Sequence, residues 1–309
     1  MYSIESDFPM GVKGLYTYLK AYRKNMYVDM IVKEAPLRIG FDAMSMLYKY
    51  KSSFEDMYPM LRELKASGHI IFFVFDGKPP VEKEAEVKDR REARESATNQ
   101  ATSLKKHLDT TVIQPTERKI LEYSLARLEF QGWHMTRDIR HTFQRALWDM
   151  EIPYVKGVGE ADDVLTDMIG AGKLDVIVST DMDFLLYGCP RLWIPFRNHS
   201  NGFEEVLLPE VLEGEGLTLD GLRDVGILCG VELLRGKVNI NSHMAFSWIR
   251  YYKSIEALLD SRIEDSQVQL LKDVELLAKV RTHFTPKTPW EAQIRPDHFE
   301  RCRAFMENL

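Results

Sequence analysis

The chain has 309 residues, of which 45% are hydrophobic and 28% charged, and its formal net charge is −6. This is the composition of an ordinary globular protein, long enough for one large domain or two modest ones. No apolar run approaches the roughly 20 residues of a membrane span, and the first nine residues lack the pattern of a secretory signal. Cys189, Cys229 and Cys302 are too far apart for a metal knuckle or a disulfide framework, so we expect a reducing compartment. The net charge argues weakly against nucleic-acid binding, although divalent ions held by an acidic cluster are absent from the count.

Three apolar segments have the pattern of buried strands, and each leads into acidic residues. "LRIGFDAMSMLYKY" leads into Asp42, "HIIFFVFDGKPP" into Asp76, and "LDVIVSTDMDFLL" into Asp181 and Asp183. Helical patterns separate these segments, which predicts an α/β fold with a mostly parallel sheet and helices on both faces. Ligands bind beyond the carboxyl ends of the strands in such sheets. We therefore expect the four carboxylates to share one crevice.

A single aspartate after a strand is usually a turn residue or a helix cap, and this alternative is open for each of them alone. Three strands that end in the same way are hard to explain by turns. Asp181 and Asp183 would also repel each other by about 4 kcal/mol at 4 Å and an effective dielectric near 20, which favours a cation between them. The helix that opens "GEADDV" adds Glu160 and Asp162, where the helix dipole alone also favours acids.

A long, charged, mostly helical insertion lies between Pro80 and Pro153. Its start, "VEKEAEVKDRREARESATNQATSLKKH", interleaves acidic and basic residues, and by composition alone a solvated helix explains it. Lys83 and Arg90 are seven residues apart, which places them on one helix face, about 10 Å apart along the axis. They follow Asp76 closely enough to overhang the carboxylate crevice.

Five sequence blocks resemble, in order and spacing, the signature blocks of the flap endonucleases, which are structure-specific 5′ nucleases: "MGVKGL", "FDAMSMLY", "VFDGKPPVEKEAEVKDR", "IPYVKGVGEADD" and "STDMDFLLYG". The resemblance covers roughly residues 10–259. It implies a PIN-like 5′-nuclease fold: a twisted, mostly parallel sheet with an inserted helical arch and a C-terminal helix–turn–helix-like module that grips duplex DNA. The expected parts of this single nuclease domain are an N-terminal extension (1–9), a first nuclease part (10–78), the arch (79–150), a second nuclease part (151–210) and the helical module with its tail (211–309).

The resemblance also implies a site with two Mg²⁺ ions, for which Mn²⁺ can substitute. Its seven carboxylates would be Asp42, Asp76, Glu160, Asp162, Asp181, Asp183 and Glu232. The first three would hold one ion, Asp181 and Asp183 the other, and Asp162 would bridge the ions or lie between them. Carboxylate oxygens suit Mg²⁺, and two such ions can activate a water and stabilise a leaving oxygen. Lys83 and Arg90 match the pair that contacts the scissile phosphate, and Tyr48 matches an aromatic residue that stacks on the neighbouring nucleotide.

The chain departs from the family pattern at four places. Asp162 stands where the family has glutamate and Glu232 where it has aspartate, and we hypothesise a compensating exchange; the alternative is a weak second ion and low turnover. The hairpin "NIN" (239–241) replaces a Gly-hydrophobic-Gly turn that exposes amides to phosphate, and Asn239 and Asn241 can keep the turn because asparagine tolerates left-handed backbone. Nine residues precede Met10 and Gly11, the usual start, whose processed terminus lies near the active site. The helix "MYPMLRELKASG" lacks the family's arginines at matching positions, although two basic residues lie nearby.

These features predict a Mg²⁺-dependent nuclease that cuts DNA near single-strand/duplex junctions in replication or repair. One alternative is an RNA endonuclease on the same scaffold, because the two-metal chemistry does not itself select deoxyribose. Another is a relative that binds nucleic acid without catalysis, against which the intact acids and arch cations argue. The expected partner is DNA with a 5′ flap or 5′ end, and we expect a monomer without a membrane or sliding-clamp partner. The expected location is intracellular, at sites of DNA replication in a nucleus or a viral replication compartment.

Overall fold

The computed structural model describes residues 11–78, 84–196, 201–234, 236–261, 263–285, 289–307 and 309. The chain divides into two compact units. The core unit comprises residues 9–77 and 146–309, and the arch unit comprises residues 1–8 and 78–145. Among the helices in the described ranges, none is both long and apolar enough to cross a membrane.

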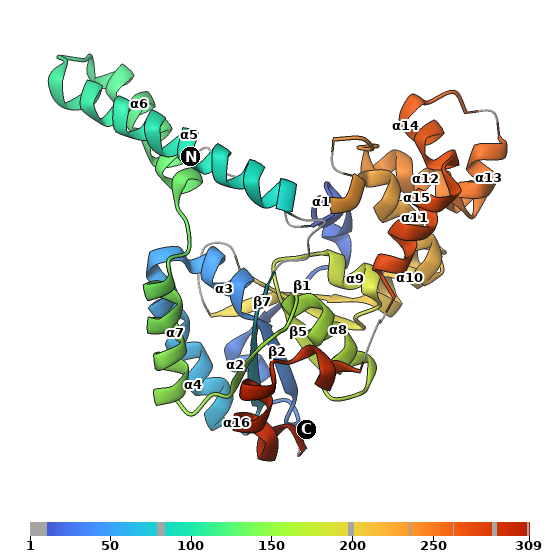
Figure 1. Cartoon of the computed structure of the whole chain (residues 1–309), viewed down its shortest axis with the longest axis horizontal. Helices are drawn as coiled ribbons and strands as arrows, with labels where there is room; N and C mark the ends of the chain where they lie inside the picture. Colours follow the sequence, from blue (N-terminus) through green and yellow to red (C-terminus); the bar gives the residue numbers. More distant parts are fainter. Residues whose placement is uncertain are drawn as a thin grey trace. The chain divides into compact units, whose positions relative to one another are not determined.

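A seven-stranded sheet, as far as the described residues go, forms the centre of the core unit (Figure 1). Its strands are β1 (Lys24–Tyr27), β2 (Arg38–Asp42), β3 (Ile70–Phe75), β4 (Tyr154–Lys156), β5 (Val176–Val178), β6 (Arg191–Pro195) and β7 (Gly202–Leu207). Their order is β1-β7-β6-β5-β2-β3-β4. The strands from β6 to β4 in this order run parallel, and β7 is antiparallel to both β6 and β1. The predicted mostly parallel α/β sheet is confirmed.

The parallel pairing brings together the three strands that lead into acidic residues. Strand β2 lies between β5 and β3, with Phe41 opposite both Val178 and Phe73. Phe41 and Phe73 are fully buried, and their rings stack with centroids 4.6 Å apart. These strands are apolar along their length because both of their faces are covered. Their carboxyl ends consequently meet at one edge of the sheet.

Short helices cover the sheet and connect its strands. In the core unit they are α1 (Leu15–Tyr18), α2 (Val28–Ile31), α3 (Ala43–Tyr50), α4 (Tyr58–Ala66), α8 (Ala161–Gly170), α9 (Asp183–Tyr187), α10 (Leu208–Glu215), α11 (Leu219–Cys229), α12 (Ser242–Tyr252), α13 (Ile255–Asp260), α14 (Ser266–Gln269), α15 (Val274–His283) and α16 (Pro296–Glu307). Helix α8 packs closely on β2 at Gly40, where an added Cβ would lie 2.8 Å from Leu165 and 2.5 Å from Leu174. The helix that carries Asp162 is thereby seated directly on the central strand.

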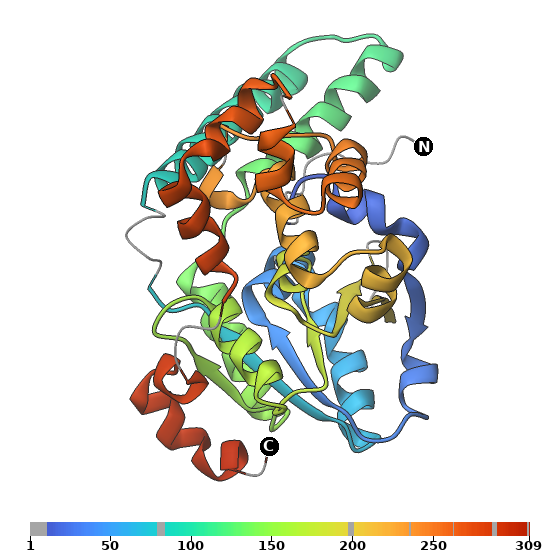
Figure 2. The ribbon, with the colours of Figure 1, turned by 90° about the vertical axis from the view of Figure 1, so that its right-hand side faces the viewer.

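Helices α11–α15 form a C-terminal helical module, drawn in orange and red in Figures 1 and 2, and Arg281 of α15 ties it together. The guanidinium of Arg281 donates to both carboxylate oxygens of Asp224 on α11, at 2.7 and 2.9 Å, and to Glu256 on α13. Asp224 also accepts a hydrogen bond from the backbone N–H of Ile255 at 3.0 Å. The same arginine lowers the pKa of Glu256 to about 2, whereas burial raises the pKa of Asp224. One cation therefore joins three helices.

We predict that Arg281→Leu lowers the free energy of unfolding by about 3–5 kcal/mol, because it leaves the Asp224 carboxylate buried without its cation. Urea denaturation at pH 7 would measure this loss. The matched control is Arg303→Leu on α16, whose partner Glu300 is exposed and whose loss should change the stability little. Since the native pKa of Glu256 is lowered, its share of the stability is present above about pH 4.5 and is lost as the pH falls toward 2. Equal losses in the two variants would contradict the prediction.

The arch unit contains two long helices, α5 (Glu84–Thr110) and α6 (Pro115–Gly132), which form an antiparallel hairpin (Figure 1). Ala97, Ala101 and Leu108 lie on one side of α5 and are buried. Gly132 ends α6 against α5, and a Cβ there would lie 2.5 Å from the hydroxyl of Thr98. Helix α7 (Arg137–Asp149) then leads from the arch unit into the core unit. The insertion predicted to be helical is helical, with small residues where its two long helices meet.

Candidate active site

Asp42 ends β2 and begins α3 at the carboxyl edge of the sheet. One of its carboxylate oxygens accepts hydrogen bonds from the backbone N–H groups of Met44 and Ser45, both at 3.0 Å. Its other oxygen accepts from the hydroxyl of Ser179, also at 3.0 Å. Asp42 is therefore a helix cap, as the simpler interpretation expected. The contact with Ser179 also turns the carboxylate toward the end of β5.

Asp76 and Glu160 come together because Asp76 binds the start of α8. The carboxylate of Asp76 accepts from the backbone N–H of Ala161 at 2.8 Å, and Gly77 donates its N–H to the carbonyl of Gly159 at 2.6 Å. Glu160 is the N-cap residue of α8, yet its side chain makes no capping hydrogen bond. The capping interpretation therefore does not apply to the Glu160 side chain.

Asp181 and Asp183 lie against the first described residues of the chain. Asp183 accepts from the backbone N–H of Val12 at 2.7 Å, and its own N–H donates to Asp181 at 2.8 Å. Gly11 has φ +65°, and a Cβ built there would lie 2.1 Å from Oδ1 of Asp181 and 2.2 Å from Oδ1 of Asp183. Both carboxylates thus point at one backbone carbon, and this position requires glycine for its space as well as for its φ.

The electrostatics of these acids show that they share one environment. Burial and then the charges of Asp76 and Asp181 together raise the pKa of Asp42 to about 7. Burial likewise raises the pKa of Asp162, with contributions from Asp42, Asp181, Asp76 and Glu160. For Asp183, burial is again the first cause, and Asp181 and Glu232 contribute. For each of these three aspartates, the charged groups that shift the pKa most are other carboxylates, and none of them is a basic side chain.

These couplings link all seven predicted carboxylates. Asp181 acts on the pKa of Asp42, of Asp162 and of Asp183, so it connects the two sets that the sequence assigned to separate ions. Glu232, in the short 3-10 helix Glu232–Leu234, acts on Asp183. Asp181 thus shares, electrostatically, the position between the two ions that the family resemblance implies for Asp162.

The donor set fits a divalent cation. Buried carboxylates that repel one another need a positive charge, and an all-oxygen set suits a hard ion. In the part of the chain that the structure describes, no three His, Cys, Asp or Glu side chains are already gathered as a metal-ligand group. The assignment of individual ligands to two ions stays a prediction.

The structure adds residues that the sequence did not single out. Ser179 donates to Asp42, and its hydroxyl accepts from the N–H of Asp181 at 3.1 Å, so it spaces two of the acids. The hydroxyl of Tyr187, on α9, shares a 3.1 Å hydrogen bond with His283, and its pKa is raised by burial and then by Asp162, Asp163, Asp183 and Glu160. In "VIVSTD" two hydroxyl residues stand between the strand and the acid, and this pattern could have identified Ser179 as a site residue from the sequence. Nothing local in the sequence pairs Tyr187 with His283.

The predicted substrate-binding residues lie in different parts of the chain. Tyr48 is half-buried on α3, nearly two turns after Asp42, the residue that caps that helix. Arg90 lies on α5 in the arch unit, and Lys83 lies outside the described residues. Their contacts with a phosphate or a nucleotide stay predictions.

The "NIN" segment differs from what was expected. Asn241 has φ −57°, and its side chain caps α12 by accepting from the N–H of His243 at 2.9 Å. The non-glycine residues with positive φ in the described ranges do not include Asn239 or Asn241, so the expectation of a left-handed asparagine turn is wrong. The N–H of Asn239 donates to the side chain of Gln267, and that of Ile240 to a backbone carbonyl. Those two amides are engaged within the protein, as is the side-chain oxygen of Asn241, and the contact of this segment with a phosphate stays a prediction.

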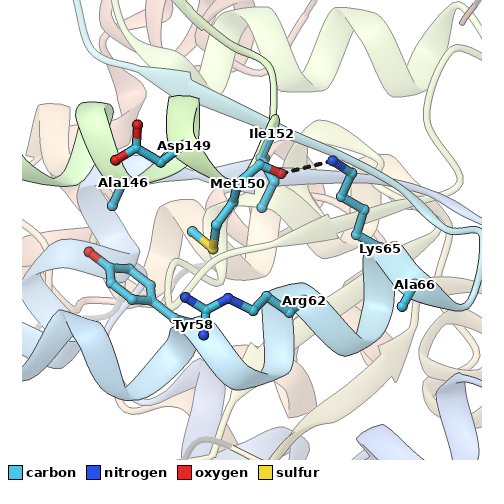
Figure 3. A pocket seen from close by; sticks show the side chains of 8 residues that line it. All are labelled: Tyr58, Arg62, Lys65, Ala66, Ala146, Asp149, Met150 and Ile152. Carbon is cyan, nitrogen blue, oxygen red and sulfur yellow. Dashed lines mark hydrogen bonds between the residues drawn. The ribbon is translucent and has the colours of Figure 1, made fainter.

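A pocket of about 590 Å³ lies between α4 and the end of α7, away from the acids (Figure 3). Arg62 and Lys65, the basic residues of the helix that lacks the family's arginines, line it. Lys65 donates to the carbonyl of Met150 at 2.8 Å (Figure 3). Lys65 and Met150 precede the amino ends of β3 and β4, whereas the acids follow the carboxyl ends. We assign this pocket no part in the chemistry of the acids.

Comparisons with known proteins agree with this architecture. The XPG I-region family matches residues 151–232. Flap endonuclease 1 of Methanothrix thermoacetophila is 30% identical over 263 residues, covering 81% of this chain and 70% of that protein. Flap endonuclease 1 of Entamoeba histolytica is 28% identical over 273 residues, covering 81% of this chain and 69% of that protein. The fold resembles the catalytic core of Rad2 in complex with DNA substrate (TM-score 0.60, 16% identity, 96% and 95% covered) and flap endonuclease-1 from Methanococcus jannaschii (TM-score 0.57, 20% identity, 96% and 93% covered).

The sheet, the helical insertion and the acids at the carboxyl edge define a protein of the 5′-nuclease fold. The chain belongs to the flap endonuclease family, whose members are metal-dependent nucleases.

Proposed function

We propose that this protein is a structure-specific 5′ nuclease that hydrolyses DNA phosphodiesters near single-strand/duplex junctions. One observation carries the proposal: seven carboxylates from five separate segments are electrostatically coupled at the carboxyl edge of the sheet. Such an edge is where α/β folds bind ligands. Seven clustered acids do not stabilise the fold by themselves, because each carboxylate raises the free energy of ionising the others.

We propose Mg²⁺ as the physiological ion, with Mn²⁺ as a substitute. Asp42, Asp76 and Glu160 would hold one ion, and Asp181, Asp183 and Glu232 the other, with Asp162 between the two sets. When bound, the ions would activate a water and stabilise the leaving oxygen of an in-line displacement. Ser179 would orient the Asp42 carboxylate and favour its ionised form, since it donates a hydrogen bond to it. The backbone N–H of Val12 would do the same for Asp183.

The cations of the arch unit complete the proposal. Lys83 and Arg90 would contact the scissile phosphate and balance charge that develops on it. Tyr48 would stack on the nucleotide beside the cut, and Asn239 and Asn241 would contact the duplex backbone through their side chains. We expect the active form to be a monomer at intracellular sites of DNA replication or repair.

The test is cleavage of a labelled 5′-flap duplex and of a matched RNA flap, each with Mg²⁺ and with EDTA. We expect metal-dependent cutting of the DNA at its junction. Cutting of RNA alone would replace the proposal with an RNA endonuclease. Binding of the flap duplex without any cutting would identify a catalytically impaired relative.

A further prediction concerns the two acids that depart from the family pattern. If Asp162 and Glu232 compensate for each other, then Asp162→Glu and Glu232→Asp should each lower kcat roughly tenfold or more, because a ligand atom moves by about one bond length. The double variant should cut flap DNA about as fast as the wild type. Single-turnover rates at saturating Mg²⁺ would decide this. A double variant that is faster than the wild type would instead mean that the natural pair impairs the site.

A further inference from the structure

The segment that follows the C-terminal helical module returns to the edge of the sheet and pairs with the loop that precedes Glu160. The N–H of Val158 donates to the carbonyl of Gln293 at 2.7 Å, and the N–H of Arg295 donates to the carbonyl of Lys156 at 2.9 Å. Between these bonds, Gly157 and Ile294 form an antiparallel bridge. Figure 2 shows this red C-terminal segment beside the green strand and helix of the sheet edge. Residues Trp290–Gln293 form a short 3-10 helix, and Ile294 after it makes a single antiparallel bridge just beyond the end of β4.

The same loop is held on its other side by the strand that leads into Asp76. The N–H of Gly157 donates to the carbonyl of Phe75 at 2.9 Å, and the N–H of Gly77 donates to the carbonyl of Gly159 at 2.6 Å. A Cβ on Gly77 would lie 2.2 Å from the carbonyl oxygen of Gly157, so the two backbones are in direct contact. The loop 157–159 is thus enclosed between Asp76's strand and the C-terminal segment, and Glu160 is the next residue.

The side chain of Gln293 makes a second link, to the helix that carries the site. Its amide nitrogen donates to the carboxylate of Asp167 on α8. Asp167 lies seven residues after Glu160, which places the two on the same face of the helix, two turns apart. Trp290 and Ile294 are almost fully buried and anchor the segment on either side of Gln293. Gln293 therefore restrains both the loop before Glu160 and the body of the helix that bears Asp162.

We propose that Gln293 is a positioning residue for Glu160 and Asp162, and that residues 290–295 form a clip that sets how well these carboxylates bind a divalent ion. The proposal rests on the proposed function for its link to catalysis. Metal-binding carboxylates depend on partners that orient them, and loss of such a partner typically weakens metal affinity 10- to 100-fold. The backbone bonds of the clip do not need the Gln293 side chain, so its amide can be removed while the bridge between Gly157 and Ile294 stays in place.

The experiment compares Gln293→Leu with wild type by titrating the full-length, DNA-free protein with Mn²⁺, followed by calorimetry and by the loss of the free Mn²⁺ spin-resonance signal. We expect Mn²⁺ affinity to fall about tenfold. On flap DNA we expect kcat to fall by a similar factor while KM for DNA stays within twofold. A variant that binds Mn²⁺ as the wild type does would overturn the proposal.

The matched control is Gln269→Leu, at a partly buried glutamine of α14 whose amide donates to the carbonyl of Ile263 at 2.6 Å. It also removes a glutamine amide donor, here one that binds a backbone carbonyl, at a loop of the C-terminal helical module. We expect its unfolding midpoint to shift about as much as that of Gln293→Leu, with unchanged Mn²⁺ affinity. If both variants lose Mn²⁺ affinity equally, general destabilisation explains the loss and the proposal is overturned.

An exchange of partners keeps the test decisive if Gln293→Leu folds poorly. Gln293→Glu alone sets a carboxylate against Asp167 and should weaken Mn²⁺ binding further. Adding Asp167→Asn to that variant lets the new amide on α8 donate to the new carboxylate at position 293, so the hydrogen bond returns with its direction reversed. We expect this double variant to recover most of the lost Mn²⁺ affinity. Additive losses would contradict a direct link between the two side chains.

If the wild type binds Mn²⁺ but cuts no DNA, the proposed function fails while the titration still tests the clip.

Discussion

Gly11→Ala is expected to reduce metal-dependent cleavage of flap DNA by roughly 100-fold, because it displaces two carboxylates by about 1 Å or more. The added Cβ would lie within 2.2 Å of Oδ1 of both Asp181 and Asp183, so neither side chain could keep its place. The left-handed φ of +65° would also cost alanine about 1–2 kcal/mol of stability. Single-turnover cleavage at several Mg²⁺ concentrations, together with thermal unfolding, would measure both effects.

Gly14→Ala separates the backbone cost from the effect on the acids. Gly14 also has a left-handed φ, +77°, but its added Cβ would approach the Ser242 hydroxyl at 3.1 Å rather than a carboxylate. We expect a comparable loss of stability and near-normal cleavage. If the two variants lose cleavage equally, the close approach of Gly11 to the acids does not matter for the reaction.

Asp181→Asn is expected to have opposite effects on activity and on the stability of the metal-free protein. Loss of one charged ligand should remove several kcal/mol of electrostatic stabilisation, which corresponds to a decrease in kcat of about 1000-fold. In EDTA, by contrast, the variant should be more stable than the wild type by on the order of 1 kcal/mol, because Asp181 repels Asp42, Asp162 and Asp183. Asparagine keeps the oxygen that accepts from the N–H of Asp183, so the local turn is preserved.

The stabilisation should depend on pH in a direction set by Asp42. Its native pKa, about 7, lies above its value in the unfolded chain, so ionisation of Asp42 destabilises the native state as the pH rises from about 4 toward 7. The advantage of Asp181→Asn in EDTA should therefore be larger at pH 8 than at pH 5. Urea denaturation at the two pH values would measure it.

Asp175→Asn is the matched control, at the amino end of the same strand, β5. Arg38 donates to both carboxylate oxygens of Asp175 and lowers its pKa, so this charge stabilises the native state. We expect the control to lose stability and to retain cleavage. If both substitutions destabilise the metal-free protein, the acids at the carboxyl edge do not repel one another as proposed.

The class of the sheet and the strands that carry the acids could be predicted from the amino-acid pattern alone. The apolar runs before Asp42, Asp76 and Asp181 are continuous because parallel strands are buried on both faces, and this pattern is visible without coordinates. Because the carboxyl ends of parallel strands lie at the same edge of a sheet, the proximity of these acids could also be predicted. The interleaved charges of the insertion likewise identified long helices.

Other features were decided by the tertiary structure because they join residues that are distant in the chain. The contact of Gly11 with Asp181 and Asp183, and the link from Gln293 to Asp167, each depend on how separate segments pack. The conformation of "NIN" was mispredicted because Gln267 and the carbonyl of Leu228 engage its amides, and no local pattern encodes those partners. Local sequence determines which residues can form a strand, a cap or a charged face, whereas the close contacts that orient a carboxylate arise only when distant parts of the chain exclude water together.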